Sequence, residues 1–301
     1  MKTQEEFHTP VMLEEVLHYL NLKPGQVIVD GTVGTAGHSR EILERILPGG
    51  RLIGIDRDEE SLSIARSRLT QYAGSFTLAH GNFADIESIL KSLEVKKIDG
   101  VLFDLGVSSF QLDDPKRGFS FQEEGPLDMR LDRSSYISAY DLLNNLNEDE
   151  ISTLLWNFGE ERWHNRIAHQ LVQERQRQPI ATTLQLAGIV TRAIPYRYRH
   201  KYYRIHPATR TFQAVRIAVN RELEILEGAL KEAIILLNKG GRICIISFHS
   251  LEDRLAKWSL RKAAAEGIVK ILTPKPLVPQ QAELTLNPSS RSAKLRSAQK
   301  V

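Results

Sequence analysis

The sequence predicts an α/β protein whose parallel sheet is interrupted by an all-α insertion. Short β-branched runs alternate with amphipathic, helix-length stretches through the first hundred residues. Helical patterns without a convincing strand dominate residues 139–238, and strand character returns at 240–248. Strands that alternate with helices form parallel sheets wound by right-handed crossovers. The predicted class is therefore a Rossmann-like, doubly wound sheet with a helical domain inserted into it.

The expected elements follow this alternation in order. We expect the first four strands at residues 26–30, 51–56, 75–80 and 98–107, and the helices between them at 38–47, 58–69 and 84–93. Residues 108–135 are expected to form a loop whose length is typical of a functional segment. A later strand is expected at 240–248, a helix at 250–263, and two last strands within 267–272 and 291–299. The predicted domains are the sheet domain, residues 1–110 and 216–301, and the insertion, residues 111–215.

Composition and charge narrow the class of protein. The 301 residues are 42% hydrophobic and 26% charged, as in ordinary soluble proteins. Cys244 is the only cysteine, which favours a reducing, cytoplasmic location, and no apolar run is long enough to cross a membrane. The net charge of +3 hides a stretch from Arg175 to Arg221 that has ten basic residues and no acid. Such a stretch indicates a polyanionic partner, most commonly nucleic acid.

A glycine-rich turn follows the first expected strand, in "IVDGTVGTAGHSREIL" (28–43). Gly34 and Gly37 allow the backbone to approach a ligand closely, and the helix that follows presents free N–H groups. Asp56, 19 residues beyond Gly37, is placed to accept hydrogen bonds from ribose hydroxyls. Phe83 offers an aromatic face for an adenine, and Asp104 ends the fourth strand. These residues predict a nucleotide-like cofactor.

Asp30, directly before the turn, favours one cofactor over another. The spacing G-x-x-G-x-x-G differs from the G-x-G-x-x-G of a dinucleotide site. A carboxylate at this place would repel a pyrophosphate, whereas it would attract a sulfonium cation. The sequence therefore favours S-adenosylmethionine. NAD(P), or a fold without ligand in which Asp30 only caps the turn, are the alternatives.

Eight stretches resemble the bacterial 16S rRNA cytosine N4-methyltransferases, in order and over nearly the whole chain. They are "HTPVMLEEV" (8–16), "DGTVGTAGHS" (30–39), "DLGVSSFQLDD" (104–114), "GFSFQEEGPLDMRLD" (118–132), "FGEER" (158–162), "HPATRTFQAVRIAVNREL" (206–223), "GGRICIISFHSLEDR" (240–254) and "NPSSRSAKLR" (287–296). The resemblance implies a class I S-adenosylmethionine methyltransferase sheet with an inserted helical domain. It also implies a target, the exocyclic N4 amine of one cytidine in the decoding centre of 16S rRNA, and a partner, that rRNA or the small ribosomal subunit.

The resemblance also assigns cofactor contacts to positions of this chain. They are Ala36, Gly37, His38, Asp56, Phe83, Asp104 and Gln111. All match the family in type except Ala36, where the family's usual turn has glycine. A methyl group there restricts the backbone of the turn, so its geometry is the feature to inspect.

The implied reaction needs a hydrogen-bond acceptor near the amine. An exocyclic amine is a poor nucleophile because its lone pair is delocalised into the ring, so its N–H must be pulled as the bond forms. Asp104 is the candidate acceptor, although its segment "DLGVSS" lacks the Asp/Asn-Pro-Pro-aromatic motif of amino-methyltransferases. The alternatives are that Asp104 only holds the cofactor, or that it only caps the loop. His249, after the expected fifth strand, is a candidate for the cytosine pocket, unless Ser250 caps the next helix and Asp253 completes a capping box. No metal is expected, since no cluster has ligand spacing.

The stretch "YRYRHKYYRIHPATRTF" (196–212) interleaves tyrosines with basic residues, as single-stranded RNA binding requires. The candidate RNA-binding residues are Arg197, Arg199, Arg204, His206 and Arg210. Alternatively the tyrosines pack inside the insertion and the arginines are solvated. "RSAKLR" (291–296) is expected to clamp RNA or to form an exposed edge strand, and Trp156 and Trp163 to lie in the core. The rival functions are an oxidoreductase on the same sheet and a cofactor-free RNA-binding assembly factor.

Overall fold

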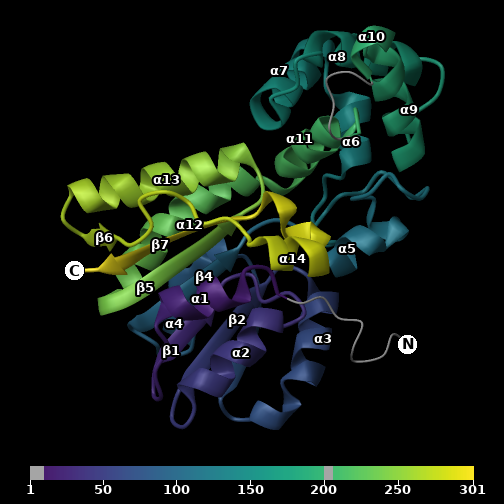
Figure 1. The fold of residues 1–301 in the computed structure, drawn as a ribbon. Helices are drawn as coiled ribbons and strands as arrows, with labels where there is room; N and C mark the ends of the chain where they lie inside the picture. Colours follow the sequence, from purple (N-terminus) through teal and green to yellow (C-terminus); the bar gives the residue numbers. More distant parts are fainter. Residues whose placement is uncertain (1–9, 200–205) are drawn as a thin grey trace. The chain divides into compact units, whose positions relative to one another are not determined.

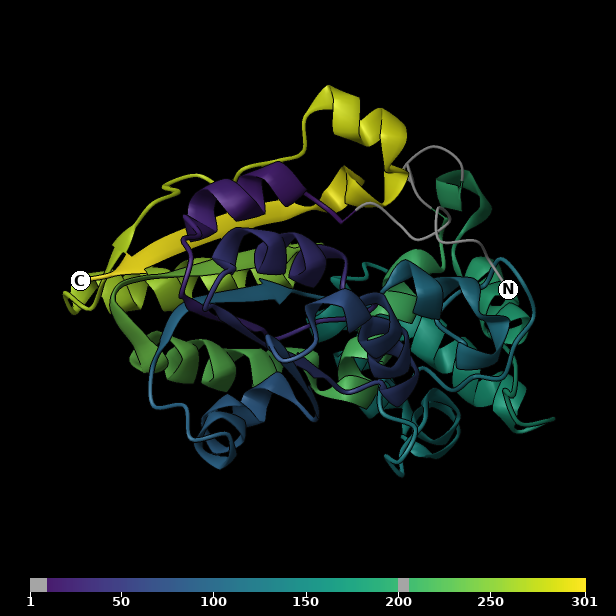
Figure 2. The same ribbon diagram turned by 90° about the horizontal axis from the view of Figure 1, so that it is seen from below.

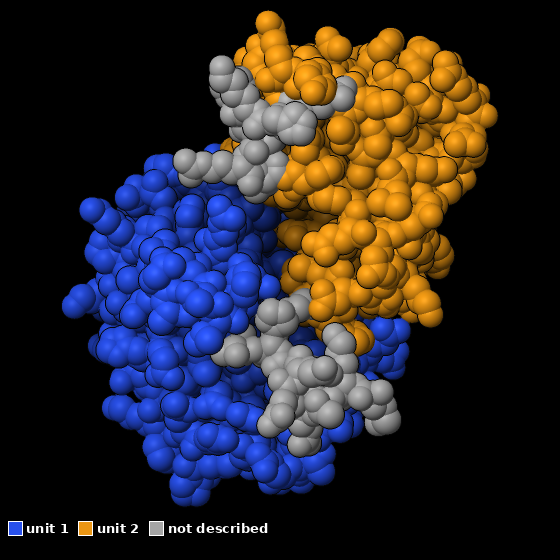
Figure 3. Space-filling view, turned by 45° about the vertical axis from the view of Figure 1, so that its right-hand side comes forward, with its two compact units in different colours: residues 1–106, 223–301 blue, residues 107–222 orange. Residues whose placement is uncertain are grey.

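The computed structural model describes residues 10–199 and 206–301 (Figure 1). The chain divides into two compact units, Met1–Gly106 with Leu223–Val301, and Val107–Glu222 (Figure 3). The first unit holds the sheet and the second is helical. Within the described ranges, no helix combines the length and the apolar character that a membrane span needs.

The sheet of the first unit has seven strands in the described part of the chain, in the order β3-β2-β1-β4-β5-β7-β6. The strands are β1 (Val27–Asp30), β2 (Arg51–Asp56), β3 (Phe76–His80), β4 (Ile98–Asp104), β5 (Leu237–Ser247), β6 (Val269–Ile271) and β7 (Lys294–Lys300). β1 to β5 are parallel, and β7 pairs antiparallel with both β5 and β6. The predicted doubly wound sheet is confirmed.

Helices cover both faces of this sheet (Figure 2). One face packs against α1 (Leu13–Leu20), α2 (Gly37–Ile46) and α3 (Glu59–Arg68). The other packs against α4 (Ile86–Ser92), α12 (Glu222–Leu236) and α13 (Ser250–Ala265). Short segments complete the unit: η2 (Thr70–Tyr72), η3 (Phe83–Asp85), α14 (Gln281–Leu286) and η5 (Pro288–Ser292). Burial on both faces explains why the strands are continuous apolar runs rather than alternating ones.

The C-terminal strand differs from the expectation of an exposed edge. β7 lies between β5 and β6, so β6 forms the edge of the sheet. Arg296 on β7 is buried, and its Nε donates to Asp253 Oδ1 at 2.6 Å. The expectation of an edge strand is therefore wrong, because the last strand inserts beside β5 and its arginine is bonded inside the unit.

The second unit is a set of helices around its own apolar core. They are α5 (Ser109–Asp113), η4 (Pro115–Arg117), α6 (Ala139–Asn145), α7 (Glu148–Gly159), α8 (His164–Arg175), α9 (Thr183–Ala193), α10 (Tyr196–Arg199) and α11 (Thr209–Asn220). The core is formed by apolar side chains of α6 to α9 and α11, together with residues of the segment that precedes α6.

The segment expected as a continuous loop, residues 108–135, contains two of these helical segments, α5 and η4. Ser108 and Asp114 cap them, and Pro115 occupies the first turn of η4. Buried Arg117 donates to the carbonyl oxygens of Arg130 and Leu131, which orders the remainder of the segment. The loop expectation was wrong at its start because short capped turns carry no helical periodicity.

The two tryptophans of the second unit have different environments. Trp163 is partly buried, and its ring lies 5.1 Å from that of Tyr198. Trp156 is 56% exposed, so the expectation that it belongs to the core is wrong. Leu154 and Leu155, its neighbours on α7, are buried instead.

Candidate active site

Four parallel strands end at the same edge of the sheet and carry most of the predicted site there. The chain leaves β1 towards β2 on one side and later returns to β4 on the other, which makes the β1/β4 pair the switch point. Asp30 and Asp104 end these two strands, and Asp56 ends β2. Ligands of open α/β sheets bind at this edge.

Asp30 organises the glycine-rich turn. One carboxylate oxygen accepts from the Thr32 backbone N–H at 3.2 Å, and the other accepts from the Ser39 hydroxyl at 2.7 Å. The side chain is buried, and burial raises its pKa to about 6, against the effect of these two bonds. Asp30 therefore holds the turn closed. Its carboxyl group also provides an ionisable negative charge at the end of β1.

Asp56 joins the same turn to β2. Its Oδ2 accepts from the Gly34 N–H at 2.7 Å, and its Oδ1 accepts from the Asp58 N–H at 2.9 Å. Burial raises its pKa to about 6. Each carboxylate oxygen has a second lone pair, so Asp56 can still accept bonds from a ligand.

The start of α2 explains the choice of residues at the end of the turn. Ala36 precedes the helix with φ 66° and is completely buried among the side chains of the first core face. A left-handed backbone strains any residue that has a Cβ, whereas glycine adopts it freely. At Gly37 a Cβ would lie 2.9 Å from Pro10 Cγ, so glycine is required there. The Ala36 methyl group is thus kept in a strained backbone by its packing in the core.

His38 lies behind the turn in a fixed orientation. Its Nε2 is 2.9 Å from the Val11 carbonyl oxygen, which can only accept, so Nε2 carries the proton. Burial lowers the pKa of His38 to about 4, and the ring is therefore neutral at pH 7. Its unprotonated Nδ1 lies 3.7 Å from Asp104 Oδ2. His38 presents a proton acceptor to the carboxyl group at the end of β4.

Asp104 is the least satisfied polar group of this edge. Its backbone N–H donates to Thr32 Oγ1 at 2.7 Å, which ties the end of β4 to the turn. Its Oδ1 is buried and has no hydrogen-bond partner among the residues that the structure describes. Burial, with the charges of Asp30 and Glu252, raises the pKa of Asp104 well above its usual value. An unpaired buried oxygen costs free energy and therefore calls for an explanation at this position.

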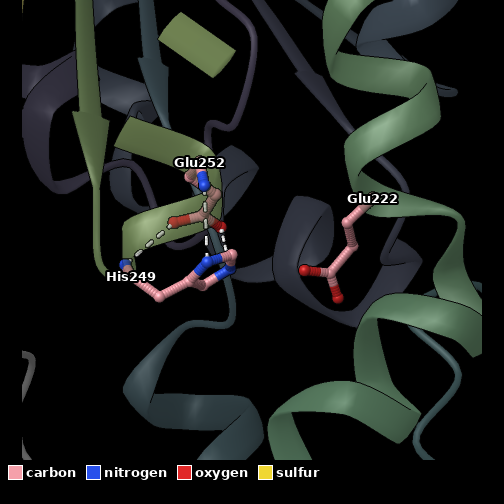
Figure 4. Close-up of side chains that lie close together, drawn as sticks. All are labelled: Glu222, His249 and Glu252. Atoms are coloured by element: carbon pink, nitrogen blue, oxygen red, sulfur yellow. Dashed lines mark hydrogen bonds and ion pairs between the residues drawn. The ribbon is translucent and has the colours of Figure 1, made fainter. Parts of the chain in front are cut away.

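His249 and Glu252 form the capping box of α13 (Figure 4). His249 Nδ1 accepts from the Glu252 N–H at 3.4 Å, and Glu252 Oε2 accepts from the backbone N–H groups of Phe248 and His249. His249 Nε2 lies 3.0 Å from Glu252 Oε1. The alternative, in which Ser250 caps the helix and Asp253 completes the capping box, is wrong. The residues that do so, His249 and Glu252, each lie one position earlier. His249 opens the helix, and its role in the cytosine pocket stays a prediction.

The remaining predicted residue of the first unit, Phe83, follows β3 in η3. Its ring packs edge-to-face against Phe103, with 5.5 Å between the ring centres, and is partly buried. One side of the ring is thus anchored in the core. Its role against adenine stays a prediction.

The second unit holds Gln111 and the predicted RNA-binding residues. Gln111 completes the capping box of α5, with its Oε1 accepting from the Ser108 N–H at 3.0 Å. Arg197 is exposed, with its guanidinium carbon 4.7 Å from the centre of the Tyr198 ring. Arg199 lies in α10, whereas Arg204 falls outside the described residues.

His206 and Arg210 frame the start of α11. His206 is largely exposed and lies against Phe121, with 4.6 Å between the ring centres, and partial desolvation of the ring lowers its pKa. Arg210 Nη1 donates to the Glu160 carbonyl oxygen at 3.0 Å. Arg210 thus has a structural bond that the sequence pattern did not reveal.

Two residues of the first unit were missed by sequence reasoning. Thr32 links the turn to Asp104, and nothing in its place in the turn distinguishes it from Thr35. Glu252 is buried and its charge acts on Asp104. A glutamate three residues after a cap is a recognised signal, but histidine is not a common cap and Ser250 concealed the true start.

The residues at this edge fit a cationic nucleoside cofactor. Three carboxyl groups at one edge, with Asp30 buried and Asp56 and Asp104 partly exposed, suit a sulfonium and disfavour a pyrophosphate. The sheet order, the glycine turn and the strand-end carboxylates define a class I S-adenosylmethionine-dependent methyltransferase.

The chain belongs to the MraW methylase family, whose sequence model matches residues 5–301. It is 48% identical to the ribosomal RNA small subunit methyltransferase H of Geotalea uraniireducens, over 98% of each chain. It is 49% identical to the protein of that name from Pelobacter propionicus, over 98% of each chain, and 45% identical to that from Clostridioides difficile, over 99% of this chain and 100% of the relative. The predicted family and the cofactor S-adenosylmethionine are confirmed.

Proposed function

We propose that this protein methylates the exocyclic N4 amine of one cytidine in the decoding centre of 16S rRNA. The relatives carry names that specify the small-subunit ribosomal RNA as their substrate. The observation that carries the proposal for the reaction is the buried, unpaired Oδ1 of Asp104 at the switch point. A carboxylate there can accept the N–H of an exocyclic amine and take up its proton as the C–N bond forms.

The residues of the edge perform distinct tasks in this proposal. S-adenosylmethionine, when bound, would supply an electrophilic methyl group and a neutral thioether as the leaving group. Asp104 accepts the amine N–H and then the proton, and its raised pKa makes it a stronger base than an exposed aspartate. His38 stays neutral and holds an unprotonated Nδ1 3.7 Å from Asp104 Oδ2, where it can accept a hydrogen bond from the protonated carboxyl group. Asp30 and Asp56 hold the turn; Asp30 favours the positive charge of the cofactor, and Asp56 accepts from its ribose hydroxyls.

The further site assignments belong to the same proposal. Gly34, Ala36, Gly37, Phe83 and Gln111 contact the cofactor. His249 supports the cytosine pocket from the first turn of α13. The insertion recognises RNA through Arg197, Arg199, Arg204, His206 and Arg210. Arg197 supports this assignment because it is exposed beside an aromatic ring, in a segment without acids.

Mass spectrometry of nucleosides tests the proposal. Small-subunit rRNA is isolated from cells with the gene, from cells without it, and from cells that express Asp104→Asn. We expect N4-methylated cytidine in the first sample alone, because an amide cannot take the proton. The proposal would be refuted if the methyl group that depends on the gene lay on another nucleoside. It would also be refuted if N4-methylcytidine were equally abundant in cells without the gene. A cofactor-free assembly factor would instead fail to bind S-adenosylmethionine in a calorimetric titration.

A further inference from the structure

One exposed face of α13, in the sheet unit, has a composition unlike the rest of that unit's helices. It consists of Lys257, Trp258, Arg261 and Lys262, which we call the α13 face. Trp258 is 57% exposed, and Arg261 and Lys262 are exposed. The helix has no acidic residue from Arg254 to Ala265. Residues three and four apart share one side of a helix, so the cations gather around the indole.

The opposite side of α13 holds this face rigidly. Ala256, Leu260 and Ala263 are buried in the core of the sheet. Asp253 on the first turn accepts from Arg296 at 2.6 Å and lies 3.6 Å from Lys294. Trp258 is not among the side chains that form or pack against the core of the sheet. Exposed tryptophan on a rigid element is a frequent anchor of binding surfaces.

The cations are already arranged around the ring. Lys257 Nζ lies 5.2 Å from the ring centre of Trp258, and the Arg261 guanidinium carbon lies 5.5 Å from it. An exposed cation–π contact is weaker than stacking of a nucleobase on an aromatic ring. A base can therefore take the place of a cation on the indole, and the displaced cation can pair with the adjacent phosphate.

We propose that the α13 face binds an unpaired segment of the RNA substrate, with a base stacked on Trp258 and phosphates paired with Lys257, Arg261 and Lys262. This inference rests on the proposed function. α13 begins at Ser250, directly after the end of β5, so it leads away from the edge that carries Asp104 (Figure 1). Trp258 lies roughly 12 Å along the helix from Ser250. RNA that reaches the site can thus continue over this face.

Binding of the full-length protein to a fluorescent single-stranded fragment of 16S rRNA tests this inference. The first variants are Trp258→Ala and Trp258→Tyr, which remove and keep an aromatic ring. We expect roughly tenfold weaker binding for the alanine variant and near-normal binding for the tyrosine variant.

A second set of variants tests the charges. K257Q/R261Q/K262Q removes three charges from the face, and R66Q/K91Q/K96Q removes three exposed charges from other elements of the same unit. We expect the first triple variant to lower the slope of log affinity against log salt by about 2, and the second to change it much less. Thermal midpoints and calorimetric S-adenosylmethionine binding confirm that all variants are folded.

Wild-type binding by both Trp258→Ala and K257Q/R261Q/K262Q would overturn the inference. Weaker binding to the assembled small subunit with unchanged binding to the RNA fragment would also overturn it, since the partner would then be a ribosomal protein. The nucleoside analysis of wild-type cells is independent of these variants. Absence of N4-methylcytidine there would refute the proposed function, while the binding data would still decide whether this face holds RNA.

Discussion

At the scale of single residues, the most consequential observation is the carboxyl group of Asp104, whose position costs free energy of folding. The partly exposed Asp104 lies near two further acids, Asp30 and Glu252, and its buried Oδ1 has no partner in the described part of the chain. Folding alone would favour an apolar residue or a satisfied one at this position. The cost is understandable if the group serves the reaction, because active sites keep strained or unpaired groups that stability would remove.

Asp104→Asn should abolish methyl transfer and, in a pH-dependent way, raise the stability of the fold. Because the folded protein raises the pKa of Asp104, the native state binds more protons than the unfolded state above the unfolded pKa. The contribution of Asp104 to the free energy of unfolding of the wild type therefore decreases as pH rises. We expect the melting temperature of the variant, relative to wild type, to increase between pH 5 and pH 8, while methyl transfer is lost. Differential scanning fluorimetry at both pH values measures the first effect.

A difference in melting temperature that is the same at pH 5 and pH 8 would show that Asp104 does not titrate in this range. Ser290→Ala, at a buried position without a titratable group, serves as a control that should give no pH-dependent difference.

Ala36 shows how a residue can differ from its family without loss of the site. Its φ of 66° is the conformation that explains glycine in the family's usual turn. Its methyl group is buried in the core, and burial of one methyl group stabilises by about 0.8 kcal/mol. This gain offsets part of the roughly 1–2 kcal/mol of strain that a left-handed backbone causes. The departure from glycine therefore costs little in folding free energy.

At the scale of elements, the first turn of α13 connects helix capping with the acid at the end of β4. Glu252 holds the cap through the backbone N–H groups of Phe248 and His249. The same carboxylate contributes to the raised pKa of Asp104. A residue that begins a helix thus also adjusts the basicity of the neighbouring strand end.

Glu252→Gln should move the pH dependence of catalysis. The amide oxygen can still accept the backbone N–H bonds, but the charge is lost, so the pKa of Asp104 falls. We expect the pH of half-maximal methyl transfer to shift to a lower value, with rates that converge at high pH. Initial rates between pH 5 and pH 9 measure the shift. Glu266→Gln, at the exposed C-terminal end of the same helix, should leave the profile unchanged; an equal shift in both variants would argue against the assignment.

At the scale of the whole molecule, the sequence predicted the sheet well because both kinds of periodicity were clear. Buried parallel strands gave continuous apolar runs, and their last residues pointed to Asp30, Asp56 and Asp104 at one edge. Other features depend on contacts between distant segments. The place of β7 beside β5 follows from strand pairing, which local pattern does not encode.

The local errors have equally specific causes. α5 and η4 are too short to show helical periodicity, and Ser250 is a better cap by type than His249, which holds the position through Glu252. Helical spacing placed Trp156 on an apolar stripe, but its neighbours fill the core. The bonds that occupy Asp30 and Asp56 were also not predictable, since they depend on the folded turn.

The central claim is that the buried carboxyl group of Asp30, at the end of β1, makes this edge a site for a sulfonium cofactor. Burial raises the pKa of Asp30 to about 6, so this group loses its proton between pH 5 and pH 7. A positive ligand favours the ionised form, and its affinity must therefore rise over this range. S-adenosylhomocysteine, which lacks the sulfonium charge, provides the matched control.

Isothermal titration calorimetry with both ligands at pH 5 and pH 7 tests this claim most directly. We expect S-adenosylmethionine to bind roughly tenfold more tightly at pH 7 than at pH 5, since one unit of pKa shift corresponds to a tenfold change in affinity. S-adenosylhomocysteine should change far less over the same range. An equal pH dependence for the two ligands would contradict the claim that Asp30 recognises the sulfonium charge.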